Sequence, residues 1–402
     1  MPIQAASSAN AVPAGTERFF KFSLQTSWRN VPCTGCSLSR KFVLELPVTF
    51  YHQLPHYADS TIPTRNRKAR NRMSELLFET DANPIPHGIK AGLLEAKDGK
   101  TLRYAILKAE TRPIRGTVVL LQGRNEFIEK YFETMTDLSE RGFAVVTFDW
   151  RGQGGSHRLL KDRQRGYVRS FDDYSDDLDL ILNQIALPDC PPPFYILGHS
   201  AGALVALSSM SRLTSRISRM VLCAPFMGLD GQRLSDDNVR RIASAFRWLG
   251  LGRVYASGGR RLASRPFAGN PLTSDPARFM RNMEIPRLNP ELALGGPTAR
   301  WLWSALDTSR RINQPDFYNG PTVPVLIIAA GADRVVSTSV IERFVARTRN
   351  VSLTTITGAR HEMLQETDFY REQLWAAFDA FIPGSSEVET MPETIEPLAS
   401  GI

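Results

Sequence analysis

The residues best suited to do chemistry are Gly198, Ser200 and Gly202, which form a G-x-S-x-G pattern. An apolar, β-favouring run, 194–197, ends just before it, and a run that predicts a helix begins just after the serine. A strand that turns sharply into a helix leaves no room for side chains where the two backbones meet, so glycines suit both flanking positions. This turn would present the Ser200 hydroxyl as a nucleophile at the positive end of a helix.

A serine nucleophile needs a histidine base, which a carboxylate orients. Of the six histidines, we choose His361, because it follows the last predicted strand and ligands meet a parallel sheet at the carboxyl ends of its strands. His199 lies inside the turn and should point away from Ser200. Asp333 ends a buried run and is the predicted carboxylate, because a buried carboxylate needs a partner. Asp230 is the alternative acid.

The third requirement is a pair of backbone N–H groups that stabilise negative charge on the attacked carbonyl oxygen. Ala201, directly after the nucleophile, is the first predicted donor. The turn at 123–126, after another predicted strand, is placed to supply the second, for which we choose Arg124. The glycines at 152–155 lack the lysine of a phosphate loop and predict a tight loop beside the same site.

Strands that alternate with helices must position these residues. The alternation predicts an α/β fold with a mostly parallel eight-stranded sheet covered by helices on both faces. The predicted strands are 92–95, 103–107, 116–122, 143–150, 194–197, 220–224, 323–330 and 351–357. The predicted helices are 129–141, 171–185, 201–216, 339–349 and 370–381.

The alternation predicts a core of 73–230 and 320–383, interrupted by an inserted helical cap, 231–319. We expect residues 1–72 to form a disordered basic leader. The alternatives are a targeting segment, or a start codon assigned too far upstream. Residues 384–402 predict a disordered acidic tail. One predicted cap helix has an apolar face at Val239, Ile242, Phe246 and Leu249, which we expect to pack on the core, with a membrane-lying helix as the alternative.

The net charge of +8 is concentrated in two segments. Residues 1–72 carry ten Lys and Arg against three Asp and Glu, and residues 231–319 carry fourteen against seven. The rest of the chain is mildly acidic, which argues against a nucleic-acid partner. A basic cap instead suits a substrate presented at an anionic membrane surface.

Four motifs resemble those of bacterial lysophospholipases and the related monoacylglycerol lipases. They are G-R-N-E-F-I-E-K-Y from residue 123, D-W-R-G-Q-G from 149, G-H-S-A-G from 198 and G-A-R-H-E from 358. Two cap segments, N-P-L-T-S-D from 270 and G-P-T from 296, resemble the lysophospholipase branch in particular.

The resemblance runs from about residue 73 to residue 381. It implies a carboxylic ester hydrolase of the α/β-hydrolase superfamily, with Ser200, Asp333 and His361 as the triad and Arg124 and Ala201 as the oxyanion donors. The lipases often have His-Gly before the oxyanion residue, whereas this chain has Gln-Gly. That difference weakens the inference of a lipase-type substrate. It does not affect the oxyanion donors, because backbone N–H groups do not depend on that side chain.

These observations predict a serine hydrolase that releases a fatty acid from a lysophospholipid or monoacylglycerol through an acyl-enzyme. The alternatives are a related hydrolase acting on another ester, a thioester or a peptide bond, and a non-catalytic binding protein with the same fold. The predicted chemistry needs no metal or organic cofactor. We expect a cytoplasmic protein with peripheral contact at the inner face of the membrane. The sequence indicates no oligomeric state.

Overall fold

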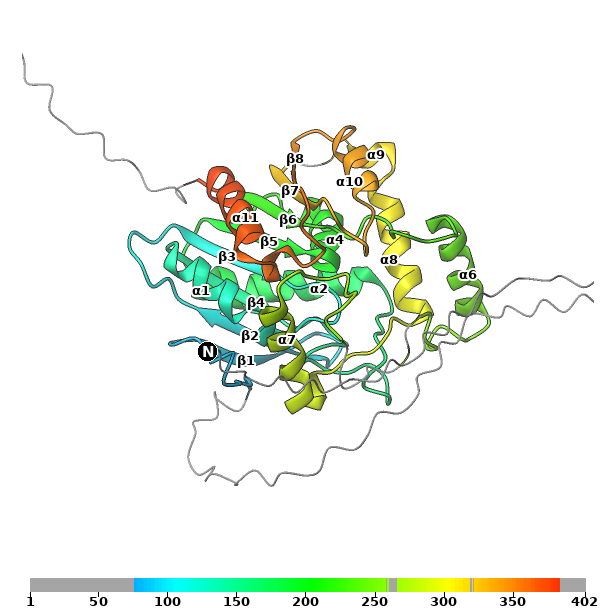
Figure 1. The fold of residues 1–402 in the computed structure, drawn as a ribbon, viewed down its shortest axis with the longest axis horizontal. Helices are drawn as coiled ribbons and strands as arrows, with labels where there is room; N and C mark the ends of the chain where they lie inside the picture. The colour runs from blue at the N-terminus through cyan, green and yellow to red at the C-terminus, as the bar shows by residue number, and fades with distance from the viewer. Residues whose placement is uncertain (1–75, 258, 260–265, 319, 321, 384–402) are drawn as a thin grey trace, which may run out of the picture. The chain divides into compact units, whose positions relative to one another are not determined.

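The computed structural model describes residues 76–383 except 258, 260–265, 319 and 321. Eight strands form one sheet in the order β1-β2-β4-β3-β5-β6-β7-β8 (Figure 1). They are β1 (Lys90–Glu95), β2 (Thr101–Leu107), β3 (Gly116–Leu121), β4 (Phe143–Phe148), β5 (Phe194–His199), β6 (Arg219–Cys223), β7 (Val325–Ala330) and β8 (Val351–Ile356). All eight predicted strands are present. The predicted leader and tail lie outside the described residues.

The six strands β4, β3, β5, β6, β7 and β8 are neighbours in that order and run parallel. The β1–β2 and β2–β4 pairs are antiparallel. Every residue of β3, β4, β5 and β7 is buried, as expected of parallel strands that have helices on both faces. The predicted α/β fold class is therefore confirmed, and the carboxyl ends of the central strands meet at one edge of the sheet.

The helices that follow these strands pack in pairs. Helix α1 (Phe132–Glu140) lies beside α11 (Asp368–Phe381), and Arg371 of α11 pairs with Asp137 of α1. Helix α2 (Phe171–Ile181) packs on α4 (Ser200–Ser208). Helix α2 begins at a capping box in which the Ser170 hydroxyl accepts from the backbone and Asp173 bonds back. Two shorter helices, α5 (Met210–Leu213) and α10 (Thr338–Val345), complete the predicted set.

Among the described residues, four α-helices lie between β6 and β7, where the sequence predicts the cap. They are α6 (Asp236–Trp248), α7 (Pro276–Leu288), α8 (Ala299–Ile312) and α9 (Pro315–Tyr318). Helix α8 packs against α4 and α2 of the core, and α6 packs on the outer side of α8 (Figure 1). The limits 231–319 of the cap stay a prediction.

The apolar face of α6 is where the structure corrects the sequence analysis. Val239 packs against the core, but Ile242, Phe246 and Leu249 are exposed, and so is the neighbouring Trp248. The expectation that this face packs on the core was wrong for those three residues. The physical reason is position: α6 packs on α8, and α8 in turn packs on the core helices α4 and α2, so only one edge of α6 reaches a buried surface.

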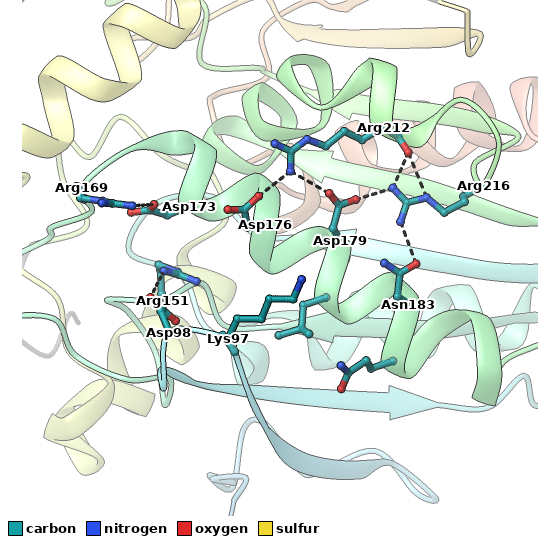
Figure 2. Close-up of a pocket in the computed structure, with 13 residues that line it drawn as sticks. Lys97, Asp98, Arg151, Arg169, Asp173, Asp176, Asp179, Asn183, Arg212 and Arg216 are labelled. Carbon is teal, nitrogen blue, oxygen red and sulfur yellow. Dashed lines mark hydrogen bonds and ion pairs between the residues drawn. The ribbon is translucent and has the colours of Figure 1, made fainter.

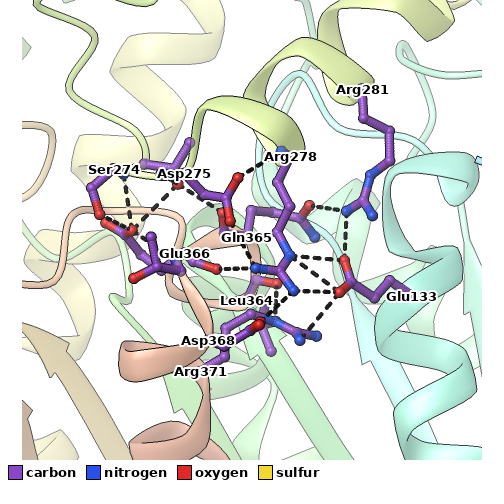
Figure 3. Close-up of polar contacts among 12 residues, drawn as sticks. Glu133, Ser274, Asp275, Arg278, Arg281, Leu364, Gln365, Glu366, Asp368 and Arg371 are labelled. Atoms are coloured by element: carbon purple, nitrogen blue, oxygen red, sulfur yellow. Dashed lines mark hydrogen bonds and ion pairs between the residues drawn. The ribbon is translucent and has the colours of Figure 1, made fainter. Parts of the chain in front are cut away.

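Helix α7 is attached to the core by ion pairs. Figure 3 shows Arg278 bonded to Glu133 of α1 and to Asp368 at the start of α11, and Arg281 reaches Glu133 as well. Burial alone would raise the pKa of Glu133, but the Arg278 hydrogen bond and the other arginines lower it to about 2. The buried Glu366 accepts from the backbone N–H of Ser274 and thereby holds the segment before α7.

No helix among the described residues is long and apolar enough to cross a membrane.

Candidate active site

The G-x-S-x-G residues form a sharp turn between β5 and α4. Ser200 has a φ of 50°, a left-handed conformation that non-glycine residues rarely adopt. A Cβ on Gly202 would lie 2.5 Å from the carbonyl oxygen of Gln122, and one on Gly198 would lie 3.1 Å from the Cα of Ala203. The close approach of backbones therefore requires glycine at 202 and leaves little room for a side chain at 198, in agreement with the sequence pattern.

The structure brings the three predicted triad residues together. The Nε2 atom of His361 is 3.0 Å from the Ser200 hydroxyl oxygen, and its Nδ1 atom is 2.8 Å from Oδ2 of Asp333. Ser200 follows β5, Asp333 follows β7 and His361 follows β8, so all three lie at the carboxyl ends of parallel strands. The side chains are buried. This geometry suits proton transfer from the serine to the imidazole.

The Asp333 carboxylate is held by its own turn. Its Oδ1 atom accepts from the backbone N–H groups of Val335 and Val336, at 2.7 and 3.0 Å, while Oδ2 faces His361. Burial alone would raise the pKa of Asp333. The hydrogen bond and charge of His361 and the two backbone donors outweigh burial, so the pKa of Asp333 is lowered. The alternative acid, Asp230, is exposed and its backbone N–H bonds to Val335.

The two predicted oxyanion residues line one small cleft. Ala201 is in the first turn of α4, where N–H groups lack intrahelical acceptors, and Arg124 is in the loop after β3. The cleft is lined by Arg124, Trp150, Gln153, Tyr174, Ala201, Val205 and Trp301, and it is too small to hold a water molecule. A substrate acyl group therefore needs the aromatic side chains or the cap to move.

The Arg124 side chain connects this cleft to the cap. Its guanidinium donates to the carbonyl oxygen of Gly295 and lies 5.3 Å from the ring centre of Trp301 in α8. Gln153 supports the same loop, because its side chain donates to the Gly123 carbonyl oxygen at 3.0 Å and accepts from the backbone N–H of Asn125 at 3.2 Å. The predicted tight loop at 152–155 thus lies beside the site.

A buried charged cluster lies next to Ser200, and the sequence analysis did not identify it. It consists of Glu126, Lys130, His199 and Glu362. A signal was available, because Glu126 and Lys130 are four residues apart in one of the motifs, the spacing of an ion pair on one helical face. The ring of His199 lies 4.9 Å from that of His361.

A larger pocket of about 840 Å³ lies elsewhere, against α2 and the β1–β2 turn, and contains none of the predicted site residues. Its charged side chains pair with one another, as Figure 2 shows: Arg212 bonds Asp176 and Asp179, and Arg216 bonds Asp179. Because most of these charges are mutually satisfied and no predicted site residue lines this pocket, we do not assign the chemistry to it.

Comparison with known proteins identifies the family. The model of the family described as serine aminopeptidase, S33, matches residues 112–368, which is more than half of the chain. The chain belongs to this family. It is an α/β-hydrolase that resembles lysophospholipases and monoglyceride lipases, and hence a carboxylic ester hydrolase.

Several curated relatives carry lysophospholipase names. Lysophospholipase L2 of Escherichia coli strain K12 is 34% identical over 276 residues, which cover 66% of this chain and 79% of that protein. The probable lysophospholipase L2 of Haemophilus influenzae is 29% identical over 289 residues, which cover 72% and 90%.

Solved structures share the fold. A soluble variant of the Saccharomyces cerevisiae monoglyceride lipase, in complex with a substrate analog, has a TM-score of 0.60 at 18% identity and covers 77% of this chain and 100% of that one. The monoacylglycerol lipase of Paleococcus ferrophilus has a TM-score of 0.57 at 20% identity and covers 70% and 99%. At such identities the likeness concerns the fold alone.

Proposed function

We propose that the protein hydrolyses the acyl ester of a lysophospholipid or monoacylglycerol, with Ser200 as nucleophile. The observation that carries the proposal is the hydrogen-bonded series Ser200–His361–Asp333 at the carboxyl ends of three strands. The lysophospholipase relatives support the substrate class, because they match about two thirds or more of this chain.

The reaction follows from the positions of the atoms. His361 Nε2 accepts the proton of the Ser200 hydroxyl as the serine oxygen attacks the acyl carbonyl, and Asp333 stabilises the imidazolium through Nδ1. The backbone N–H groups of Arg124 and Ala201 stabilise the oxyanion. The imidazolium then protonates the leaving alcohol. Water, deprotonated by His361, attacks the acyl-enzyme and releases the fatty acid.

A substrate panel tests this proposal. Purified protein is mixed with lysophosphatidylethanolamine, a monoacylglycerol, a short p-nitrophenyl ester and an aminoacyl p-nitroanilide, and product release is measured with Ser200→Ala as the control. We expect fatty acid release from at least one of the two lipids, at a kcat/KM above that for the anilide. Amide cleavage without ester cleavage would favour instead the peptide-bond alternative, which agrees with the family's description.

We also propose that α6 attaches the enzyme to an anionic lipid surface. Trp248 is 80% exposed and Leu249 is 74% exposed, and Ile242 and Phe246 are exposed on the same helix. The exposed Arg241 lies among them. Aromatic and aliphatic side chains beside arginines are the composition of a helix that lies in a membrane interface, where the proposed substrates are found.

Vesicle sedimentation tests this surface. Trp248→Ser combined with Leu249→Ser should abolish binding to phosphatidylglycerol vesicles at low salt while activity on a short soluble ester is retained. Phe369→Ser removes an equally exposed apolar side chain from α11 and is the matched control. Absence of wild-type binding, or an equal loss in the control, would contradict the proposal.

The electrostatic contribution needs a separate variant. Arg247 stacks on Trp303 at 4.0 Å and Arg240 pairs with Asp307, so reversing either charge would damage the cap. Arg241→Glu changes charge alone. Each basic residue near an anionic surface is worth about 1 kcal/mol, so this reversal should weaken vesicle binding by about fivefold or more.

A further inference from the structure

The Glu126 carboxylate is the centre of the buried cluster beside Ser200. Its side chain is 2% exposed. It accepts from the backbone N–H of Gly123, from the Tyr131 hydroxyl at 2.6 Å, from Lys130 Nζ at 2.8 Å and from His199 Nδ1 at 3.2 Å. Because these partners donate, the carboxylate is ionised. Burial alone would raise the pKa of Glu126, but the charges of Lys130 and His199 outweigh burial and lower this pKa.

Both ring nitrogens of His199 face acceptors. Nδ1 faces the Glu126 carboxylate, and Nε2 is 3.1 Å from the backbone carbonyl oxygen of His361. A neutral imidazole can donate from only one nitrogen, so both acceptors are satisfied only by the imidazolium. Burial lowers the pKa of His199, but the charge and hydrogen bond of Glu126 more than offset this and the pKa is raised.

The charge balance of the cluster leads to the same assignment. The carboxylate of Glu126 is buried and that of Glu362 is half-buried, and Lys130 pairs with both, at 2.8 and 2.7 Å. With a protonated His199 the four groups sum to zero charge. With a neutral His199 one negative charge is left uncompensated in a buried site, which is strongly unfavourable.

We propose that His199 is a permanent imidazolium that, with Glu126, positions the two loops of the active site. Glu126 fixes the Gly123 N–H and thereby the loop that carries Arg124. The His199 imidazolium fixes the backbone of His361 by donating from Nε2 to the His361 carbonyl oxygen. A Cβ at residue 123 would lie 2.7 Å from Glu126 Oε2 and 2.8 Å from His199 Nδ1, so this contact requires glycine. The inference rests on the function proposed above.

The titratable neighbours of His199 come from several elements. Glu126, Lys130 and Tyr131 lie after β3, Glu362 and His361 follow β8, and Cys223 pairs with His199 across β5 and β6. Burial raises the pKa of the Cys223 thiol to about 12, so this thiol carries no charge at neutral pH. The ring of His361 lies 4.9 Å from that of His199 between ring centres.

The protonation state of His199 is measured directly by NMR of protein labelled with ¹⁵N-histidine. We expect one histidine whose two ring nitrogens both stay protonated from pH 5.5 to 8.5, and whose signals disappear in His199→Gln. Glu126→Gln should allow this histidine to titrate. A neutral His199 at pH 7 in the wild type, or unchanged protonation in Glu126→Gln, would overturn the proposal. This readout needs no activity, so it is independent of the proposed reaction.

The positioning role is measured by kinetics on a short ester. His199→Gln should lower kcat at least tenfold with little change in KM, because the imidazolium positions the active-site loops and does not bind the substrate. His157→Gln replaces an exposed histidine and is the matched control. An unchanged kcat in His199→Gln, or an equal loss in His157→Gln, would contradict the proposal, whereas a wild type inactive on all esters would refute the proposed function instead.

Discussion

Replacing Asp333 by asparagine should disable the base while leaving the fold intact. In the native protein Oδ1 of Asp333 accepts from the N–H groups of Val335 and Val336, and Oδ2 accepts from Nδ1 of His361. An asparagine has one oxygen and one NH₂ group. The two backbone donors hold the oxygen, so the NH₂ group must face His361.

The consequence is the wrong tautomer of the base. Because an NH₂ group donates to Nδ1, the His361 proton moves to Nε2, and the imidazole can no longer accept the proton of Ser200. The same exchange in a Ser-His-Asp enzyme lowers kcat by about 10⁴-fold. That factor corresponds to about 5.5 kcal/mol of transition-state stabilisation.

The assay is steady-state hydrolysis of a short p-nitrophenyl ester, with melting temperature as the fold control. Asp333→Asn should lose about 10⁴ in kcat at an almost unchanged melting temperature. Asp230→Asn, at an exposed aspartate that also follows a strand, should keep wild-type kcat. Equal losses in the two variants, or a loss below tenfold for Asp333→Asn, would refute the assignment of the acid.

Three further outcomes are expected. Gly202→Ala places a Cβ 2.5 Å from the Gln122 carbonyl oxygen, so calorimetry should show a loss of about 1–3 kcal/mol in stability. The raised pKa of His199 contributes stability that is fully present below its unfolded pKa of about 6.5 and is lost as pH rises through the folded pKa. Melting temperature should therefore fall more with rising pH in the wild type than in His199→Gln. Deleting residues 1–72 should leave activity and melting temperature unchanged, because the sheet and the predicted site lie within the described residues.

The fold and the positions of the triad could be predicted from the sequence because both depend on local patterns. Apolar runs separated by amphipathic runs define a parallel sheet, and such a sheet collects the residues that follow its strands at one edge. Ser200, Asp333 and His361 each come shortly after a strand, so their proximity follows from topology alone.

The features that were missed depend on tertiary contacts. The face of α6 could not be oriented, because an amphipathic pattern does not say whether its apolar side meets the core or solvent, and α8 occupies the position next to the core helices α4 and α2. The cluster of Glu126, Lys130 and Glu362 joins residues more than 200 positions apart. Its polar residues read as surface residues until the fold buries them.

Covalent labelling tests the central claim, that Ser200 is the nucleophile of an ester hydrolase. The native protein is treated with a fluorophosphonate, and the modified residue is located by peptide mass spectrometry, with Ser200→Ala as the control. The account predicts one adduct, on Ser200, with loss of ester hydrolysis in parallel and no adduct in the variant. An unlabelled protein that still hydrolyses esters, or an adduct on another residue, would contradict it.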